Sequence, residues 1–308
     1  MKTTILLSLL LTIQVYLSHG QAVYQIPDTA KKIVFLGNSI TYSGGYVDYI
    51  EAILRLEFPE RKWEFINLGL SSETVSGLSE AGHADGQFPR PNLHERLERV
   101  LNAAQPDLVF SCYGMNDGIY LPFDSERFEK YQEGQILLNQ KVVQSGADII
   151  HLTPSIYDEK KGEAYANLLD IYASWLISQK FNQYWKVIDL HWPMKIYQHN
   201  KRSEVADFAL AADGIHPGDL GHWLMARELL VGLGFDQLKK INHPELVFEK
   251  GSKRKEVLDL VKEKQMILKN AWLSHTGHQR PGVKEGLPLQ EALEIAKSMD
   301  SAIVELLK

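Results

Sequence analysis

The chain alternates short apolar runs with longer amphipathic stretches, and this alternation limits the folds open to it. Apolar runs typical of buried strands lie at 33–36, 63–66, 108–112, 147–152 and 185–190. Helical patterns follow at 46–57, 93–104, 125–146, 164–181 and 220–233. Strands that alternate with helices indicate a parallel sheet with helices on both faces. With 308 residues, 44% of them hydrophobic, the chain is large enough to bury such a sheet.

Two short motifs supply groups that can carry out nucleophilic catalysis. Ser39 lies in 37–41 (GNSIT), directly after the first strand-like run, and Asp213 precedes His216 by three residues in 213–217 (DGIHP). A serine hydroxyl is a poor nucleophile at neutral pH unless an imidazole takes its proton, and a carboxylate usually orients that imidazole. The two motifs together predict a serine hydrolase.

Two further polar segments follow strand-like runs, namely 67–74 (NLGLSSET) and 114–117 (GMND). In open parallel sheets, sites form beyond the carboxyl ends of the strands, so these segments can converge with the first two motifs. Four such blocks in this order resemble the SGNH, or GDSL, hydrolase family. The resemblance covers about residues 31–233, and we expect a hydrolase domain over 28–235.

This resemblance implies a fold and a set of roles. The fold is a flavodoxin-like three-layer α/β/α sandwich with a five-stranded parallel sheet. The catalytic groups are Ser39 as nucleophile, His216 as general base and Asp213 as the carboxylate that orients it. The oxyanion hole is formed by the backbone N–H groups of Ser39 and Ser72 and by the side-chain amide of Asn116.

The chain departs from the family pattern at two positions. Asn38 stands where an aspartate usually precedes the serine, and Ser72 stands where a glycine normally offers its N–H to the oxyanion. Serine keeps that N–H, but its Cβ restricts φ, so we expect the role to survive if the loop is not left-handed. Gly69 is the alternative donor.

The two ends of the chain differ from the central domain. Residues 1–20 resemble a cleavable signal peptide, with Lys2, a short apolar stretch at 5–13, and small residues that permit cleavage after Gly20 or Ala22. We therefore expect a secreted or periplasmic protein without a membrane anchor. Residues 236–308 read as a helical extension, with a final helix at 288–307. Within it, 270–282 is predicted to be a loop, and whether this loop reaches the active site is left open.

Several residues are candidates for contacting the substrate: Arg90, Trp272, His275 and Arg280. Arg90 lies near the second block, and the other three lie in the predicted loop. Functional residues are over-represented on loops, although for Arg90 a surface position is the simpler interpretation.

Composition excludes some functions. The formal net charge is −6 and there is no basic stripe, which argues against a nucleic-acid partner. His275 and His278 have a spacing that a metal could use, but no nearby carboxylate completes a ligand set, and the other histidines lack paired spacing. Neither a metal nor another cofactor is therefore expected. Cys112, the only cysteine, ends a strand-like run and is expected to be buried and inert. The oligomeric state is left open.

The substrate is the least determined property. Aromatic residues near the four blocks suit sugar rings, and no long apolar segment is available to line an acyl tunnel. We therefore expect hydrolysis of short-chain acyl esters, most of all acetyl, on a carbohydrate. A secreted lipase or lysophospholipase is the alternative. A glycan-binding protein of the same fold that no longer cuts is an alternative of another class.

Overall fold

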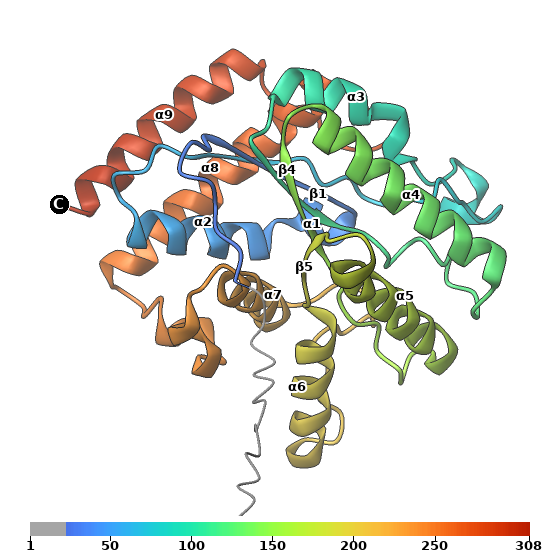
Figure 1. The fold of residues 1–308 in the computed structure, drawn as a ribbon. Coiled ribbons are helices and arrows are strands. Elements are labelled where there is room, and N and C mark those ends of the chain that lie inside the picture. Colours follow the sequence, from blue (N-terminus) through green and yellow to red (C-terminus); the bar gives the residue numbers. More distant parts are fainter. Residues whose placement is uncertain (1–22) are drawn as a thin grey trace, which may run out of the picture.

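The computed structural model describes residues 23–308 and places a parallel sheet between two layers of helices (Figure 1). The sheet has five strands in the order β2-β1-β3-β4-β5, and all neighbouring pairs are parallel. This confirms the predicted flavodoxin-like order. The strands are β1 (Lys32–Gly37), β2 (Glu64–Asn67), β3 (Leu108–Cys112), β4 (Asp148–Leu152) and β5 (Lys186–Ile188).

The strands form because each apolar run is long enough to cross the core and is covered on both faces. All five residues of β3 are buried, and so are the last five of β1. Phe35 of β1 stacks on Phe110 of β3 with 5.1 Å between ring centroids. Strands buried on both faces read as continuous apolar runs, which is why the sequence predicted them.

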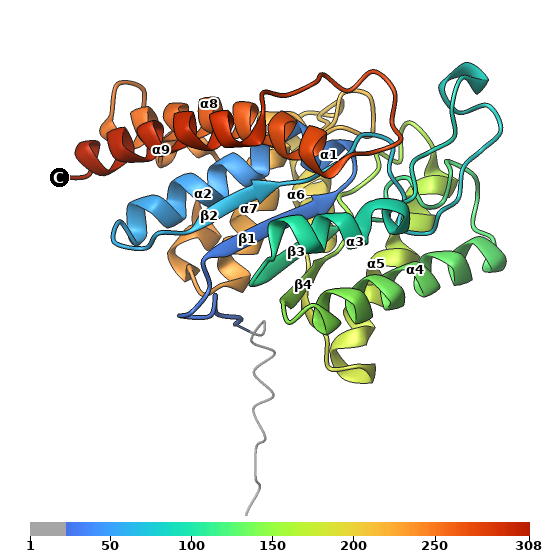
Figure 2. The ribbon, with the colours of Figure 1, turned by 90° about the horizontal axis from the view of Figure 1, so that it is seen from above.

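Helices cover both faces of the sheet (Figure 2). On one face α2 and α7 pack against each other, and α3, α4 and α5 lie on the other face. The helices before the C-terminal extension are α1 (Ser39–Ser43), α2 (Gly45–Glu57), α3 (Leu93–Ala104), α4 (Ser125–Gln144), α5 (Glu163–Asn182), α6 (His191–Glu204) and α7 (Asp219–Gly232). No helix within residues 23–308 is long and apolar enough to cross a membrane.

Helix α6 was not predicted from the sequence. Its buried residues are His191, Met194 and Gln198, so only one of them is apolar. Pro193 lies in the first turn, where proline is tolerated, but the same residue reads as a helix breaker in the sequence. The helix therefore lacks the apolar stripe on which the prediction of the others depended.

The C-terminal extension covers the edge of the sheet. It contains two short 3₁₀ turns, η2 (Asp236–Lys240) and η3 (Pro244–Leu246), followed by α8 (Lys253–Thr276) and α9 (Leu289–Leu306). Helix α8 packs against α2 and the edge strand β2, and α9 packs on α8. The Gln265 side-chain amide donates to the backbone carbonyl of Phe65 in β2 at 3.0 Å. The extension thus covers an edge strand whose backbone would otherwise be free to pair with other chains.

The prediction of a loop at 270–282 is wrong for the first half of this segment. Helix α8 continues to Thr276, so Trp272 and His275 lie on a helix, and the irregular segment begins at Gly277. The buried residues Leu268, Ala271 and Trp272 continue the apolar spacing of the helix. The predicted signal peptide, residues 1–20, lies outside the described residues.

Candidate active site

Ser39 lies at the carboxyl end of β1, as the first residue of the short helix α1. Asn38 caps this helix because its side chain accepts a hydrogen bond from the Ile40 N–H at 3.0 Å. Asparagine and aspartate are about equally good N-caps, which explains why Asn38 can replace the usual aspartate. Gly37 leaves room for the turn, since a Cβ there would lie 2.1 Å from the Thr41 hydroxyl oxygen.

Ser39, His216 and Asp213 form a continuous hydrogen-bonded series. The Ser39 Oγ lies 2.8 Å from His216 Nε2, and His216 Nδ1 lies 2.7 Å from Asp213 Oδ2. A carboxylate accepts only, so Nδ1 carries the ring proton and the Nε2 lone pair faces the serine hydroxyl. This is the arrangement in which an imidazole can take the proton of the serine.

The charge of Asp213 is secured by its hydrogen bonds. Partial burial alone would raise the pKa of the Asp213 carboxyl, but the His216 ring and the backbone N–H groups of His216 and Ile215 lower it to about 2. The His216 and Asp213 side chains remain 50% and 52% exposed. The site is therefore open to solvent, and a bulky substrate can approach the imidazole.

The second block adopts a left-handed turn. Ser72 has a φ of 68°, so the condition set from the sequence, a loop that is not left-handed, is not met. This conformation is unfavourable by about 1–2 kcal/mol for a non-glycine residue, whereas glycine adopts it without a comparable penalty. Because glycine adopts left-handed conformations readily, the backbone at Ser72 still takes the course that a glycine at this position could take. Within residues 23–308, the Ser72 N–H has no hydrogen-bond partner.

Gly69 fits a packing role better than the alternative donor role. Its N–H donates to the Asn67 side-chain oxygen at 2.9 Å, so that donor is already used. A Cβ at Gly69 would lie 2.3 Å from the Tyr42 backbone nitrogen. The glycine thus allows the second block to pack closely on α1.

The third block meets the second at Asn116, which is buried. The Asn116 side-chain nitrogen donates to the Glu73 carbonyl at 3.1 Å, and its oxygen accepts from the Tyr120 hydroxyl at 3.0 Å. The adjacent Asp117 is fully buried and accepts from the backbone N–H groups of Val75 and Ser76, both at 2.8 Å. The two blocks are therefore joined directly by hydrogen bonds.

Of the four candidate substrate residues, only Arg90 lies beside the proposed oxyanion donors. Its guanidinium is 3.5 Å from the Ser72 carbonyl and forms a bidentate pair with Glu80. It is buried rather than on the surface, so its donors are largely engaged within the protein.

The other three candidates lie further along the extension. Trp272 is buried in α8, His275 is exposed at the end of that helix, and Arg280 lies over the Phe88 ring with 5.1 Å to its centroid. Among the described residues, none of the three forms a hydrogen bond, ion pair or ring contact with Ser39, Asp213 or His216. The segment after α8 therefore contacts the loop between the second block and α3, through Arg280 and Phe88.

Sequence reasoning missed one residue that the extension brings to the site. Lys269 of α8 donates to the Tyr42 carbonyl at 2.6 Å, and its ammonium lies 4.3 Å from the Tyr42 ring centroid. Tyr42 is three residues beyond Ser39. No local pattern marks Lys269, because the contact joins positions far apart in the chain.

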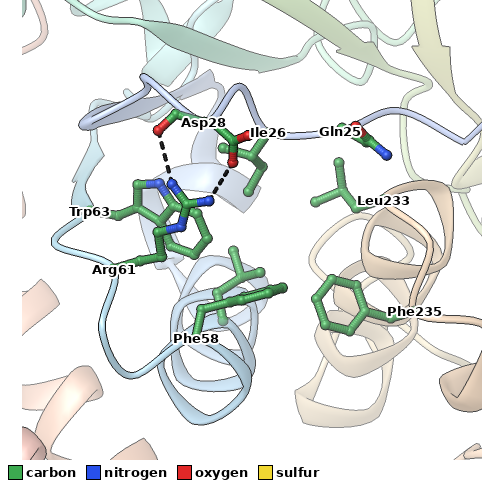
Figure 3. Close-up of a pocket in the computed structure, with 9 residues that line it drawn as sticks. Gln25, Ile26, Asp28, Phe58, Arg61, Trp63, Leu233 and Phe235 are labelled. Atoms are coloured by element: carbon green, nitrogen blue, oxygen red, sulfur yellow. Dashed lines mark hydrogen bonds and ion pairs between the residues drawn. The ribbon is translucent and has the colours of Figure 1, made fainter.

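Other possible centres are not supported. Burial raises the pKa of the Cys112 thiol to about 12, so it stays protonated and unreactive at neutral pH. No group of three or more potential metal ligands occurs in the described part of the chain. A cavity of about 250 Å³ lies between the segments that precede β1 and β2 and the end of α7, with Arg61 and Asp28 paired at its rim (Figure 3). It is at the amino ends of these strands, opposite Ser39.

Comparisons with known proteins identify the family of this chain. Residues 35–224 match the GDSL-like lipase/acylhydrolase family. An acetylxylan esterase from Geobacillus stearothermophilus is 25% identical over 234 residues, which cover 68% of this chain and 97% of that enzyme.

Solved structures show the same fold. A catalytic mutant of the acetylxylan esterase Axe2 from Geobacillus stearothermophilus has a TM-score of 0.55 at 24% identity, over 69% of this chain and 97% of the other. LAE5, an alpha/beta hydrolase enzyme from the metagenome of Lake Arreo, Spain, has a TM-score of 0.53 at 25% identity, over 66% and 95%. The chain therefore belongs to the GDSL-like lipase/acylhydrolase family and is an ester-hydrolysing enzyme.

Proposed function

We propose that this enzyme is a secreted serine esterase that removes short acyl groups, acetyl above all, from a carbohydrate. The observation that carries the chemistry is the hydrogen-bonded series from Ser39 through His216 to Asp213, with distances of 2.8 and 2.7 Å. The substrate class is supported by the similarity to an acetylxylan esterase over almost all of that enzyme's length.

The reaction follows from the atoms that face each other. Ser39 Oγ attacks the ester carbonyl carbon while His216 Nε2 takes the hydroxyl proton. The tetrahedral intermediate collapses, the bond to the alcohol breaks, and His216 returns the proton to the leaving alcohol oxygen. Water then repeats the sequence on the acyl-enzyme, releasing the carboxylic acid and restoring Ser39. Asp213 stabilises the imidazolium formed in each half.

The oxyanion of each intermediate needs donors that are already in place. The Ser39 N–H lies at the start of α1, where the first N–H groups of a helix have no partner within the helix. The Ser72 N–H and the second hydrogen of the Asn116 side-chain amide complete the set. Loss of one donor of this kind typically costs on the order of 10²–10³ in turnover.

The openness of the site favours a large alcohol and a small acyl group. The His216 and Asp213 side chains are about half exposed, and Tyr42, which lies within α1, is partly exposed. Flat aromatic faces near an open serine suit sugar rings. Export by residues 1–20 would bring the enzyme to extracellular polysaccharides.

A substrate panel tests the proposal and its alternatives together. The purified protein is assayed on p-nitrophenyl acetate, butyrate and octanoate and on acetylated xylan, with the Ser39→Ala protein as background. The proposal predicts that kcat/KM is highest for acetate and that acetate is released from xylan. Higher activity on octanoate would favour a lipase. Binding of xylan without any hydrolysis would favour the glycan-binding alternative.

Secretion is tested separately. Expression of the full chain with a C-terminal tag should yield an exported protein whose N-terminus begins at residue 21 or 23. Retention in the cytoplasm at full length would contradict the proposed signal peptide.

A further inference from the structure

The orientation of the Asn116 amide is fixed by two neighbours. The Glu73 carbonyl can only accept, so the Asn116 atom 3.1 Å from it must be the nitrogen. The oxygen therefore faces the Tyr120 hydroxyl at 3.0 Å, where it accepts a hydrogen bond. One of the two amide hydrogens is used by Glu73, and one remains. Both contacts together determine where this remaining N–H points.

Tyr120 is held in place at a cost in backbone strain. Ile119 and Tyr120 both have left-handed backbone conformations, with φ of 48° and 56°. Such conformations are unfavourable for non-glycine residues and persist where the surroundings enforce them. The Tyr120 ring stacks on Tyr165 with 4.8 Å between centroids. Burial raises the pKa of the Tyr120 hydroxyl, so it remains a donor at every pH at which an esterase is assayed.

Arg90 connects this tyrosine to the second block. Its guanidinium carbon lies 5.2 Å from the centroid of the Tyr120 ring, within the range of a cation–π contact. The same guanidinium is 3.5 Å from the Ser72 carbonyl. Glu80 fixes it with two short contacts, 2.7 Å to Nε and 2.6 Å to Nη2. One buried cation thus touches the segments that carry two of the three proposed oxyanion donors.

We infer that Tyr120 and Arg90 are positioning residues of the oxyanion hole. Tyr120 aims the free N–H of Asn116 at the oxyanion, and Arg90, held by Glu80, fixes the Tyr120 ring relative to the Ser72 turn. This inference rests on the serine-esterase function proposed above. It replaces the earlier expectation that Arg90 binds substrate.

The expected size of the effect follows from the type of contact. A hydrogen bond accepted by the Asn116 oxygen polarises the amide and strengthens its N–H as a donor. A neutral hydrogen bond contributes a modest net amount, so its removal should lower kcat about three- to tenfold, less than removal of a donor. KM should stay within about twofold, because the oxyanion forms only after substrate binds.

The first test is a double-mutant cycle on p-nitrophenyl acetate with Tyr120→Phe and Asn116→Ala. Tyr120→Phe alone should lower kcat, and in the Asn116→Ala background it should cause no further loss. The matched control is Tyr157→Phe, which should leave kcat unchanged, because among residues 23–308 the Tyr157 hydroxyl has only a 3.4 Å contact with the Lys161 carbonyl. Additive losses, a silent Tyr120→Phe, or an equal loss in the control would each overturn the inference.

The second test separates positioning from substrate binding at Arg90. Arg90→Lys keeps the charge but loses the bidentate contact with Glu80. We expect a several-fold lower kcat with KM nearly unchanged on both p-nitrophenyl acetate and acetylated xylan. A higher KM on xylan with unchanged kcat would show that Arg90 contacts the substrate and would overturn its assignment here.

Failure of the positioning roles and failure of the serine-esterase activity give different results. If the wild-type protein hydrolyses p-nitrophenyl acetate but the losses of kcat in the double-mutant cycle are additive, only the positioning inference is wrong. If the wild-type protein neither hydrolyses p-nitrophenyl acetate nor reacts with a fluorophosphonate, both the serine-esterase proposal and the positioning inference are wrong. Thermal unfolding of Tyr120→Phe checks that the variant is folded.

Discussion

Asp213 contacts His216 twice, using one carboxylate oxygen for the ring Nδ1 at 2.7 Å and the other for the backbone N–H at 2.8 Å. The three-residue spacing makes this possible, because the turn brings the backbone of His216 back over the carboxylate. The imidazole is thereby held in one tautomer and one direction, with Nε2 toward Ser39. The short motif alone thus supplies both the base and its support.

Substitution of Asp213 by asparagine should damage catalysis far more than folding. An amide at this position can donate to Nδ1, which favours the wrong tautomer, and kcat should fall on the order of 10⁴-fold, as in other serine hydrolases. Steady-state kinetics on p-nitrophenyl acetate measure the loss, and circular dichroism checks the fold. A loss of less than tenfold would show that Asp213 does not orient the base.

Ser72 tests the cost of a side chain in a left-handed turn. Ser72→Gly keeps the N–H and relieves a strain of about 1–2 kcal/mol, partly offset by about 0.5–1 kcal/mol of added unfolded-state entropy. Activity should be retained, and the melting temperature should be unchanged or about 2 °C higher. Ser72→Val should lower both, since a branched side chain fits this φ poorly. Strong loss of kcat in Ser72→Gly would mean that the hydroxyl itself takes part.

Asp48 of α2 should make stability depend on pH. Burial, and secondarily the nearby charge of Glu51, raise its pKa to about 8 against the opposing effect of Lys262 and Lys269. The unfolded chain loses this proton near pH 4, whereas the folded protein keeps it until about pH 8. Stability should therefore fall as pH rises through this window, by at most about 1.4 kcal/mol per pH unit.

Urea unfolding of Asp48→Asn measures this dependence. The variant should match the wild type below pH 4 and become progressively more stable than it between pH 4 and 8. The matched control is Asp107→Asn, because backbone N–H groups of Lys31 and Lys32 lower the pKa of Asp107 despite the opposing effect of burial. The control should lose stability relative to the wild type at neutral pH. A pH-independent difference for Asp48→Asn would contradict the raised pKa.

A buried ion cluster should anchor the C-terminal extension to α2. Glu51 is fully buried and accepts from Lys264 of α8 at 2.5 Å, while Arg55 donates to the same oxygen at 3.1 Å. Glu51→Leu leaves Lys264 and Arg55 with only the partly exposed Asp300 as an acidic partner, and it should cost up to about 3–5 kcal/mol of unfolding free energy. The exposed pair Lys130–Glu133 provides the control, and Glu133→Gln should be nearly neutral. Equal effects of the two substitutions would show that the cluster does not anchor the extension.

The sequence predicted the sheet well because its strands are apolar on both faces. It predicted that the four blocks can converge, because a parallel sheet brings the carboxyl ends of its strands to one edge. Ser39 and His216 meet there despite a separation of 177 positions. The sequence did not predict α6, because most of the buried residues of this helix are polar. It ended α8 too early because His275, Gly277 and Pro281 resemble a loop, although the apolar face of the helix continues through Trp272.

The details around the oxyanion donors depend on tertiary contacts. The left-handed conformations of Ser72 and Tyr120 are not ones their residue types prefer, so no local propensity predicts them. The contacts of Arg90 with Glu80 and Tyr120 join two loops whose paths are set by the rest of the fold. The sequence identifies these residues as polar or aromatic neighbours of the blocks, but only the folded chain shows which of them touch.

The most direct test of the account is the identity of the nucleophile. Wild-type and Ser39→Ala proteins are treated with a fluorophosphonate, analysed by intact mass and peptide mapping, and assayed on p-nitrophenyl acetate. We expect one adduct on the wild-type protein, on the peptide that contains Ser39, and neither adduct nor hydrolysis for Ser39→Ala with an unchanged melting temperature. Labelling of Ser39→Ala at the wild-type rate would place the nucleophile elsewhere and contradict the account.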